Sequence, residues 1–196
     1  MLLLGIPAFL GQLIAAGAAP KLADKHGAAT TFAQANVFAG LALLAAFALF
    51  LCRPQQLTQA LPFTLLILLL FCNMFCCGLV NTVQSILIAD AADLTEKESG
   101  IRRDGIFVSG QSLLIKLSTA VSALLQGLVF AISGFSGTAV RQINRALYAG
   151  ADFATDPSFA TPRFAMFFLF LCLPGIAYLL SALPYRKGRN PHKAPV

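Results

Sequence analysis

The sequence is poor in charged residues, and none of its acidic residues lies inside an apolar segment. Only 11% of the 196 residues are charged, whereas 58% are hydrophobic and the mean hydropathy is +0.78. A water-soluble domain of this size could not cover so much apolar surface with so few charges. All eight Asp and Glu residues fall in loops or at predicted helix ends. The sequence therefore predicts an all-α membrane protein with about five transmembrane helices.

Two other classes of protein are disfavoured by what the chain lacks. The net charge is +6, but the cations are scattered between apolar segments and form no continuous basic patch with interleaved aromatic residues. No nucleic-acid partner is therefore predicted. No nucleophile is paired with a base, and both histidines lie in loops, so we do not expect an enzyme.

The five cysteines lie in apolar segments or at their ends. Cys72, Cys76 and Cys77 have a helical spacing that could collect a soft metal. More often such residues pack as small apolar side chains on a helix surface. We therefore predict neither a metal site nor a cofactor.

Five apolar segments are separated by polar or charged loops, and each is long enough to cross a bilayer. They span residues 2–19, 32–51, 61–88, 105–134 and 163–183. Residues 1–184 form one predicted membrane domain, and 185–196 form a basic tail. The Pro174-Gly175 pair predicts a kink in the last segment.

The distribution of lysine and arginine predicts the orientation in the membrane. One set of loops and the tail hold nine of these residues, namely Lys21, Lys25, Lys97, Arg102, Arg103, Arg186, Lys187, Arg189 and Lys193. The other set holds four, namely Arg53, Arg141, Arg145 and Arg163. Because cytoplasmic loops are rich in Lys and Arg, we expect the N-terminus outside and the C-terminus in the cytoplasm.

Lys116 is the one full charge within the segment 105–134. Eleven residues separate it from Gly105, about 16 Å of helical rise, which places it near the middle of a bilayer core about 30 Å thick. A cation there costs about 3 kcal/mol. Either the side chain snorkels to the headgroups, which is a long reach from mid-depth, or it faces a polar cavity with a carboxylate. This chain has no such carboxylate within its apolar segments, so the partner must come from elsewhere.

Two polar stripes follow helical spacing. Ser109, Ser112, Lys116, Thr119 and Ala123 share one predicted face, flanked by Gln111 and Ile115. Another stripe consists of Asn73, Cys77, Asn81 and Gln84. In hydrocarbon such a stripe faces other helices or a wet cavity, and for the second stripe both alternatives are open.

The most charged part of the chain is ADAADLTEKESGIRRDG, which is followed closely by QSLLIK. This stretch resembles the loop between the tenth and eleventh helices of the melibiose-carrier type of sugar:cation symporters. These are the glycoside–pentoside–hexuronide branch of the major facilitator superfamily. The turn LADKHG, which contains Asp24, resembles the loop between the eighth and ninth helices of that superfamily. The resemblance covers the whole chain as helices eight to twelve of twelve.

The resemblance implies a fragment of a carrier for a small sugar-like solute, driven by Na⁺ or H⁺, in the bacterial inner membrane. Positions matching the family's sugar and coupling contacts are Lys116, Gln111, Ser112, Ile115 and Asn81. Positions matching a cytoplasmic gate are Asp90, Asp93, Glu96, Arg102, Asp104 and Asp24. The acids that form the cation site would lie on N-terminal helices of the carrier that this chain lacks. The partners implied are therefore the lipid bilayer, the solute and those helices.

A different interpretation remains open from the residues alone. The chain could be a small non-transporting membrane protein, such as an assembly partner, or an inactive truncated gene product.

Overall fold

The computed structural model describes residues 2–54, 56, 59–101, 104–133, 137–151 and 156–187, and within these every regular element is helical. Four long helices come first: α1 (Leu2–His26), α2 (Ala28–Cys52), α3 (Ala60–Ser99) and α4 (Asp104–Ile132). The short α5 (Gly137–Tyr148) follows, then α6 (Ala160–Phe167) and α7 (Leu173–Ala182). The predicted all-α membrane fold is confirmed.

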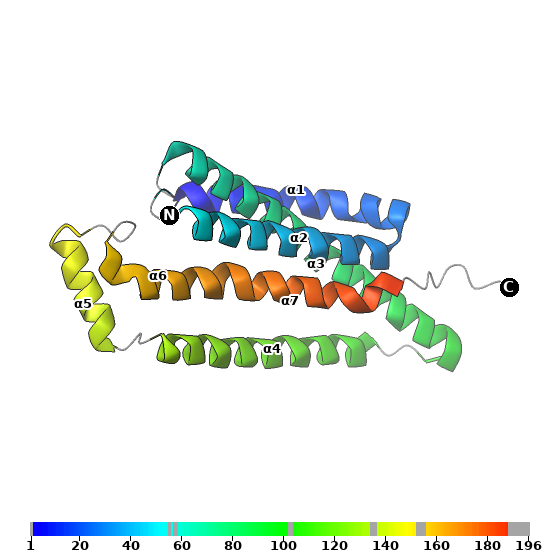
Figure 1. The fold of residues 1–196 in the computed structure, drawn as a ribbon. Helices are drawn as coiled ribbons and strands as arrows, with labels where there is room; N and C mark the ends of the chain where they lie inside the picture. The colour runs from blue at the N-terminus through cyan, green and yellow to red at the C-terminus, as the bar shows by residue number, and fades with distance from the viewer. Residues whose placement is uncertain are drawn as a thin grey trace.

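The described residues contain four helical stretches long and apolar enough to cross a membrane: Ala28–Cys52, Ala60–Ser99, Asp104–Ile132 and Ala160–Tyr185. About five spans were predicted. The remaining one, α1, lies outside this set, and its last two turns carry Lys21, Asp24 and Lys25. With 25 residues α1 is nevertheless about 37 Å long, and it lies along α2 and α3 as a member of the bundle (Figure 1).

Two helices, α1 and α3, extend by seven or more residues beyond the apolar segments predicted from the sequence. The predicted segment 2–19 ends just before Pro20, but α1 continues through this proline to His26. Ala19 and Ala23 are buried in the same core cluster as Val83 of α3, and this packing offsets the backbone hydrogen bond that proline lacks. The segment 61–88 likewise continues as helix to Ser99 and includes most of the acidic stretch.

The last span is helical through Pro174 because its backbone adapts locally. α6 and α7 are joined by a π-helical turn at Phe168–Cys172, just before Pro174. A wider turn here accommodates the missing N–H of proline. A 3₁₀ turn (Pro157–Phe159) precedes α6 and another (Leu183–Lys187) follows α7.

The bundle is held together by close approaches between small residues. A Cβ on Gly78 of α3 would lie 2.7 Å from the Cβ of Ala15 and 2.9 Å from the carbonyl oxygen of Gln12 in α1. A Cβ on Gly40 of α2 would lie 2.8 Å from the carbonyl oxygen of Gly175 in α7. Without a hydrophobic drive between helices in lipid, such backbone proximity supplies much of the packing energy.

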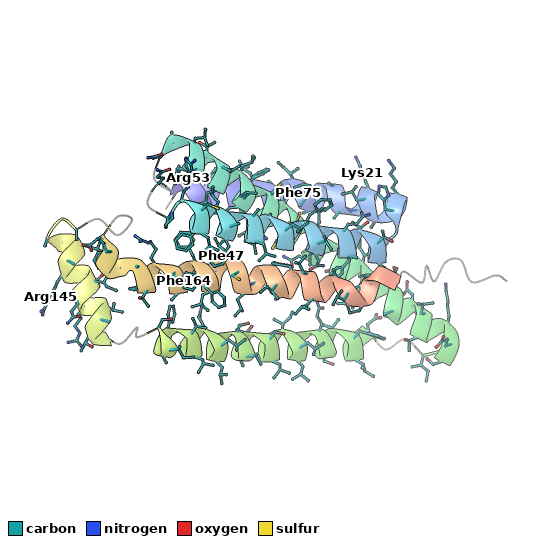
Figure 2. All side chains as sticks on the ribbon, in the orientation of Figure 1. Lys21, Phe47, Arg53, Phe75, Arg145 and Phe164 are labelled. Carbon is teal, nitrogen blue, oxygen red and sulfur yellow. The ribbon has the colours of Figure 1, made fainter. Side chains whose placement is uncertain are left out.

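Beyond the contact between Gly40 and Gly175, aromatic rings fill the space between α2 and α6. The rings of Phe47 and Phe164 have centroids 6.0 Å apart (Figure 2), and the rings of Phe50 and Phe167 are stacked with centroids 4.1 Å apart. These contacts anchor the last span to α2 along most of its length.

Polar side chains inside the bundle are paired across helices. The side-chain amide of Asn36, which is 2% exposed, donates to the carbonyl oxygen of Phe32 at 2.8 Å. Its Oδ1 accepts from the hydroxyl of Ser181 in α7, also at 2.8 Å. Such pairs join α2 to α7 where water is absent.

We predict that Gly78→Ala weakens the bundle by about 1–3 kcal/mol, because the new methyl group meets α1 backbone that cannot move aside cheaply. Gly17→Ala in α1 is the control. No atom lies within 4 Å of the point that its Cβ would occupy, so this change removes a helix-interior glycine and is neutral or stabilising by up to about 1 kcal/mol. Unfolding free energies in lipid–detergent micelles measure both, and equal effects of the two variants would contradict the close approach.

Candidate solute-binding site between α3 and α4

A cavity of about 790 Å³ lies where α3 and α4 face each other, with contributions from α2 and the residues after α7. This is the size range of small-molecule sites in proteins. Its polar lining consists of Gln84 from α3 and of Gln111, Ser118, Thr119 and Ser122 from α4. Its other walls are formed mainly by aliphatic and aromatic side chains, among them Leu87, Ile88, Phe107 and Ile115.

One side of the cavity is built by two aromatic rings. Phe32 of α2 and Tyr185 both line it, and their ring centroids lie 4.7 Å apart at an interplanar angle of 54°. Tyr185 was assigned from the sequence to the tail 185–196, but it lies in the helical turn Leu183–Lys187. The cavity thus combines a few amides and hydroxyls with large apolar surfaces, which is the usual composition of a site that orients a small neutral molecule.

The structure separates the residues predicted to bind solute or couple it to a cation. Gln111 and Ile115 line the cavity. Lys116 is exposed and lies outside that lining, because five residues along a helix turn it about 140° away from Gln111. Ser112 lies about 100° from Gln111 and is also exposed outside the lining.

The face of α4 that carries Lys116 is uncovered within the described chain. No described residue of α4 is buried, and Ser109, Ser112 and Lys116 are all exposed. In the view of Figure 1, α4 lies at the edge of the bundle with its axis parallel to that of the last span. Thr119 was predicted to share the lysine's face, but it lies near the boundary between the two faces and lines the cavity.

The polar stripe of α3 divides between the two roles left open by the sequence. Asn73 is buried and its side-chain amide donates to the carbonyl oxygen of Ala39 at 3.3 Å. Cys77 Sγ lies 2.6 Å from the hydroxyl oxygen of Tyr178. These two residues therefore bind neighbouring helices, whereas Gln84 lines the cavity. Asn81, predicted as a sugar contact, is exposed and outside the cavity lining.

The described residues among those predicted to form a gate lie at one end of the bundle, where α1 and α3 end and α4 begins (Figure 1). Asp90 and Asp93 are exposed and Glu96 is partly exposed in the last turns of α3, while Asp24 is exposed near the end of α1. Asp104 begins α4, where a carboxylate favours the helix N-terminus, and it borders a second, smaller cavity together with Gln111. Asp93, Glu96 and Asp104 each have an interaction partner. Arg102 lies outside the described residues.

The turn between α3 and α4 requires a glycine. Gly100 ends α3 with φ of 69°, in the left-handed region, and its N–H donates to the carbonyl oxygen of Glu96 at 2.8 Å. This conformation suits glycine, which has no Cβ to clash with the following carbonyl. The turn sets where α4 departs from α3, and so helps to place the two walls of the cavity.

The cysteines form no recognisable ligand set in the structure. Cys72, Cys76 and Cys77 are free thiols on α3. Within the residues that the structure describes, no group of three or more His, Cys, Asp or Glu side chains is arranged to hold a metal ion.

Several lining residues were not singled out from the sequence. Ser118 and Ser122 follow Gln111 and Ile115 at steps of three and four. The residue spacing alone therefore indicates that these four side chains share one face of the helix. Phe32 and Tyr185 lie 153 positions apart in the chain, and no local pattern brings them together.

An all-helical bundle with several membrane-crossing helices and a partly polar cavity between two of them defines a multi-pass membrane protein. The sequence pattern of the family described as "MFS/sugar transport protein", where MFS is the major facilitator superfamily, matches residues 1–187. The chain belongs to this family, which confirms the predicted resemblance.

One curated relative is also similar to the chain. It is the "Uncharacterized 29.9 kDa protein in crtE 3'region" of Pseudescherichia vulneris, which is 27% identical over 139 residues. The alignment covers 71% of this chain and 47% of the relative, so the chain spans about half the length of that protein. No solved structure matches the chain.

We predict that Gly100→Ala costs about 1–2 kcal/mol of stability, because alanine is strained at positive φ. Gly105→Ala is the matched control five residues later. It lies in the first turn of α4, has no atom within 4 Å of the point that its Cβ would occupy, and is expected to be neutral or stabilising. Denaturant unfolding in micelles distinguishes them. A harmless Gly100→Ala would contradict the left-handed turn.

Proposed function

We propose that this chain is part of a secondary active transporter that moves a small sugar-like solute together with Na⁺ or H⁺. The observation that carries the proposal is the cavity between α3 and α4, where amides from two facing helices meet hydroxyl groups and aromatic rings. Membership of a family of sugar transport proteins supports the same solute class.

The chemistry of the cavity suits a neutral molecule rich in hydroxyl groups. Each glutamine offers a carbonyl acceptor and an NH₂ donor, and the Ser and Thr hydroxyls can donate or accept. Gln84 and Gln111 therefore present both kinds of group from opposite walls. The rings of Phe32 and Tyr185 supply an apolar surface for the carbon–hydrogen faces of a sugar.

Coupling to a cation is assigned to the other face of α4. Lys116 lies twelve residues into this 29-residue helix, about 18 Å along its axis, and therefore close to the bilayer centre. An ammonium at that depth costs about 3 kcal/mol unless it is paired. We propose that further helices pack on this face and supply a carboxylate, which pairs with Lys116 when it is empty and holds the cation when it is filled.

The charged segment is proposed to act as a cytoplasmic gate. Asp90, Asp93 and Glu96 recur every three residues along the end of α3, and Asp104 begins the next helix. Ion pairs from this face would hold the cytoplasmic side closed while the cavity is open outside, and the two states would alternate as helices rock about the midplane. With this gate on the cytoplasmic side, we propose that the N-terminus lies outside and the C-terminus in the cytoplasm.

We predict that Gln111→Ala raises the KM for the solute about fivefold, because one neutral hydrogen bond contributes about 1 kcal/mol. Gln126→Ala is the control, since Gln126 lies on the same helix outside the cavity lining. Uptake of a panel of labelled glycosides, pentoses and hexuronides is measured in cells expressing the chain together with the amino-terminal helices of a family member. Equal KM values for the two variants would remove Gln111 from the site.

Lys116→Ala is expected to abolish accumulation driven by a Na⁺ or pH gradient while leaving solute exchange at equilibrium. Two variants serve as controls. Lys116→Arg keeps the charge at this position, and Lys21→Ala removes an exposed lysine at the far edge of the bundle (Figure 2). Gradient-driven uptake that survives Lys116→Ala would refute the coupling role. No uptake of any solute by the unmodified assembly would instead favour a non-transporting membrane protein.

A further inference from the structure

Helix α5 is amphipathic and does not belong to the packed bundle. Its apolar residues occupy one arc of about 120° on a helical projection, namely Ala139, Val140, Ile143, Ala146 and Leu147. Thr138, Arg141, Gln142 and Arg145 occupy the opposite side, and Arg141 and Arg145 lie one turn apart. The length is 12 residues, too short to cross a bilayer.

The apolar arc of α5 is partly accessible. No described residue of α5 is buried, Val140 and Leu147 are 41% and 40% exposed, and the other three apolar residues of the arc are half-buried. Arg141 and Arg145 are exposed on the other side. A helix with this composition in free water would leave its apolar arc solvated, whereas at a membrane surface the arc enters the boundary between headgroups and acyl chains.

The position of α5 keeps it near the edge of the bilayer. Only five chain positions separate Ile132, the end of the spanning helix α4, from Gly137 at the start of α5, a reach of at most about 18 Å. Figure 1 shows α5 at the end of the bundle, with its axis at a steep angle to the axes of α4 and α6. If those axes follow the membrane normal, α5 lies roughly in the membrane plane.

Two further features match an interfacial position. Tyr148 ends α5 and is 93% exposed, and tyrosine is enriched where apolar and wet regions of a bilayer meet. Arg145 and Arg53 both lie at this end of the molecule (Figure 2), opposite the acidic end of α3. On α5 itself, Arg141 and Arg145 lie one turn apart, and a pair of cations at a headgroup surface favours negatively charged phosphates.

We infer that α5 is an interfacial membrane-binding helix, with its apolar arc inserted at the acyl boundary and Arg141 and Arg145 bound to phosphates of anionic phospholipids. This surface is separate from the cavity between α3 and α4, and it requires only that the chain spans a bilayer. By holding α4 and the last span to the same interface, α5 would limit how far these two helices can slide along the membrane normal.

The absence of tryptophan from the sequence makes this inference directly measurable. Ile143→Trp or Leu147→Trp places a single fluorophore on the apolar arc, and Gln142→Trp places one on the polar side. The full chain is reconstituted in nanodiscs of phosphatidylcholine with phosphatidylglycerol. We expect blue-shifted emission from the two apolar-arc variants, strong quenching by brominated lipid and weak quenching by acrylamide, with the reverse pattern for Gln142→Trp.

Two outcomes would overturn the inference. If acrylamide quenches all three fluorophores alike, α5 stands in water. If the apolar-arc fluorophores are protected from both acrylamide and brominated lipid, protein covers the arc. Using two apolar-arc positions guards against a single variant that disturbs the helix, and circular dichroism verifies the fold of each.

The arginines are tested by comparing quenching from brominated phosphatidylglycerol with quenching from brominated phosphatidylcholine in the Ile143→Trp background. The anionic lipid is expected to be enriched about fivefold for each arginine at low salt, and added salt should reduce this preference. Arg141→Gln with Arg145→Gln removes the enrichment, whereas the control Arg53→Gln retains it. Enrichment that is unchanged in the double variant would refute headgroup binding by these residues.

Discussion

Hydrocarbon offers no hydrogen-bond partners, and this constraint governs both the backbone and the polar side chains of the chain. Each long segment forms a helix because only then are its N–H and C=O groups satisfied within the segment. The same requirement explains why Asn36 bonds to Phe32 and Ser181, and why Asn73 bonds to Ala39. Once these groups are paired, close contacts at glycine set how the helices cross.

The helix α4 combines two faces with different chemistry. Gln111, Ser118 and Ser122 turn towards α3 and share a cavity with Gln84. Lys116 is turned about 140° away from Gln111, onto a face that the described chain leaves open. In the proposed transporter, solute recognition and cation coupling would therefore act on opposite faces of one helix, and an event on either face would be transmitted by movement of the whole helix.

The sequence was sufficient to predict the fold class and the family, because these depend on apolar length and on local motifs. It was not sufficient to predict which face of α4 lines the cavity. Residues 109–123 contain two polar arcs, one with Ser112 and Lys116 and one with Gln111, Ser118 and Ser122. Only the contact with α3 distinguishes them, and that contact depends on the turn at Gly100. The pairing of Phe32 with Tyr185 is likewise purely tertiary.

The π-helical turn at Phe168–Cys172 has a consequence for how this span tolerates changes in length. It accommodates an additional residue within the helix, and beyond it Gly175 meets Gly40. Removing one residue within this turn would restore a regular α-helix and leave the residues after it facing the same neighbours, whereas removing one residue from α6 would rotate α6 and α7 relative to each other by about 100°. In the second case a bulkier side chain would face Gly40 in place of Gly175, so we expect this span to tolerate a one-residue deletion at the π turn better than one in α6.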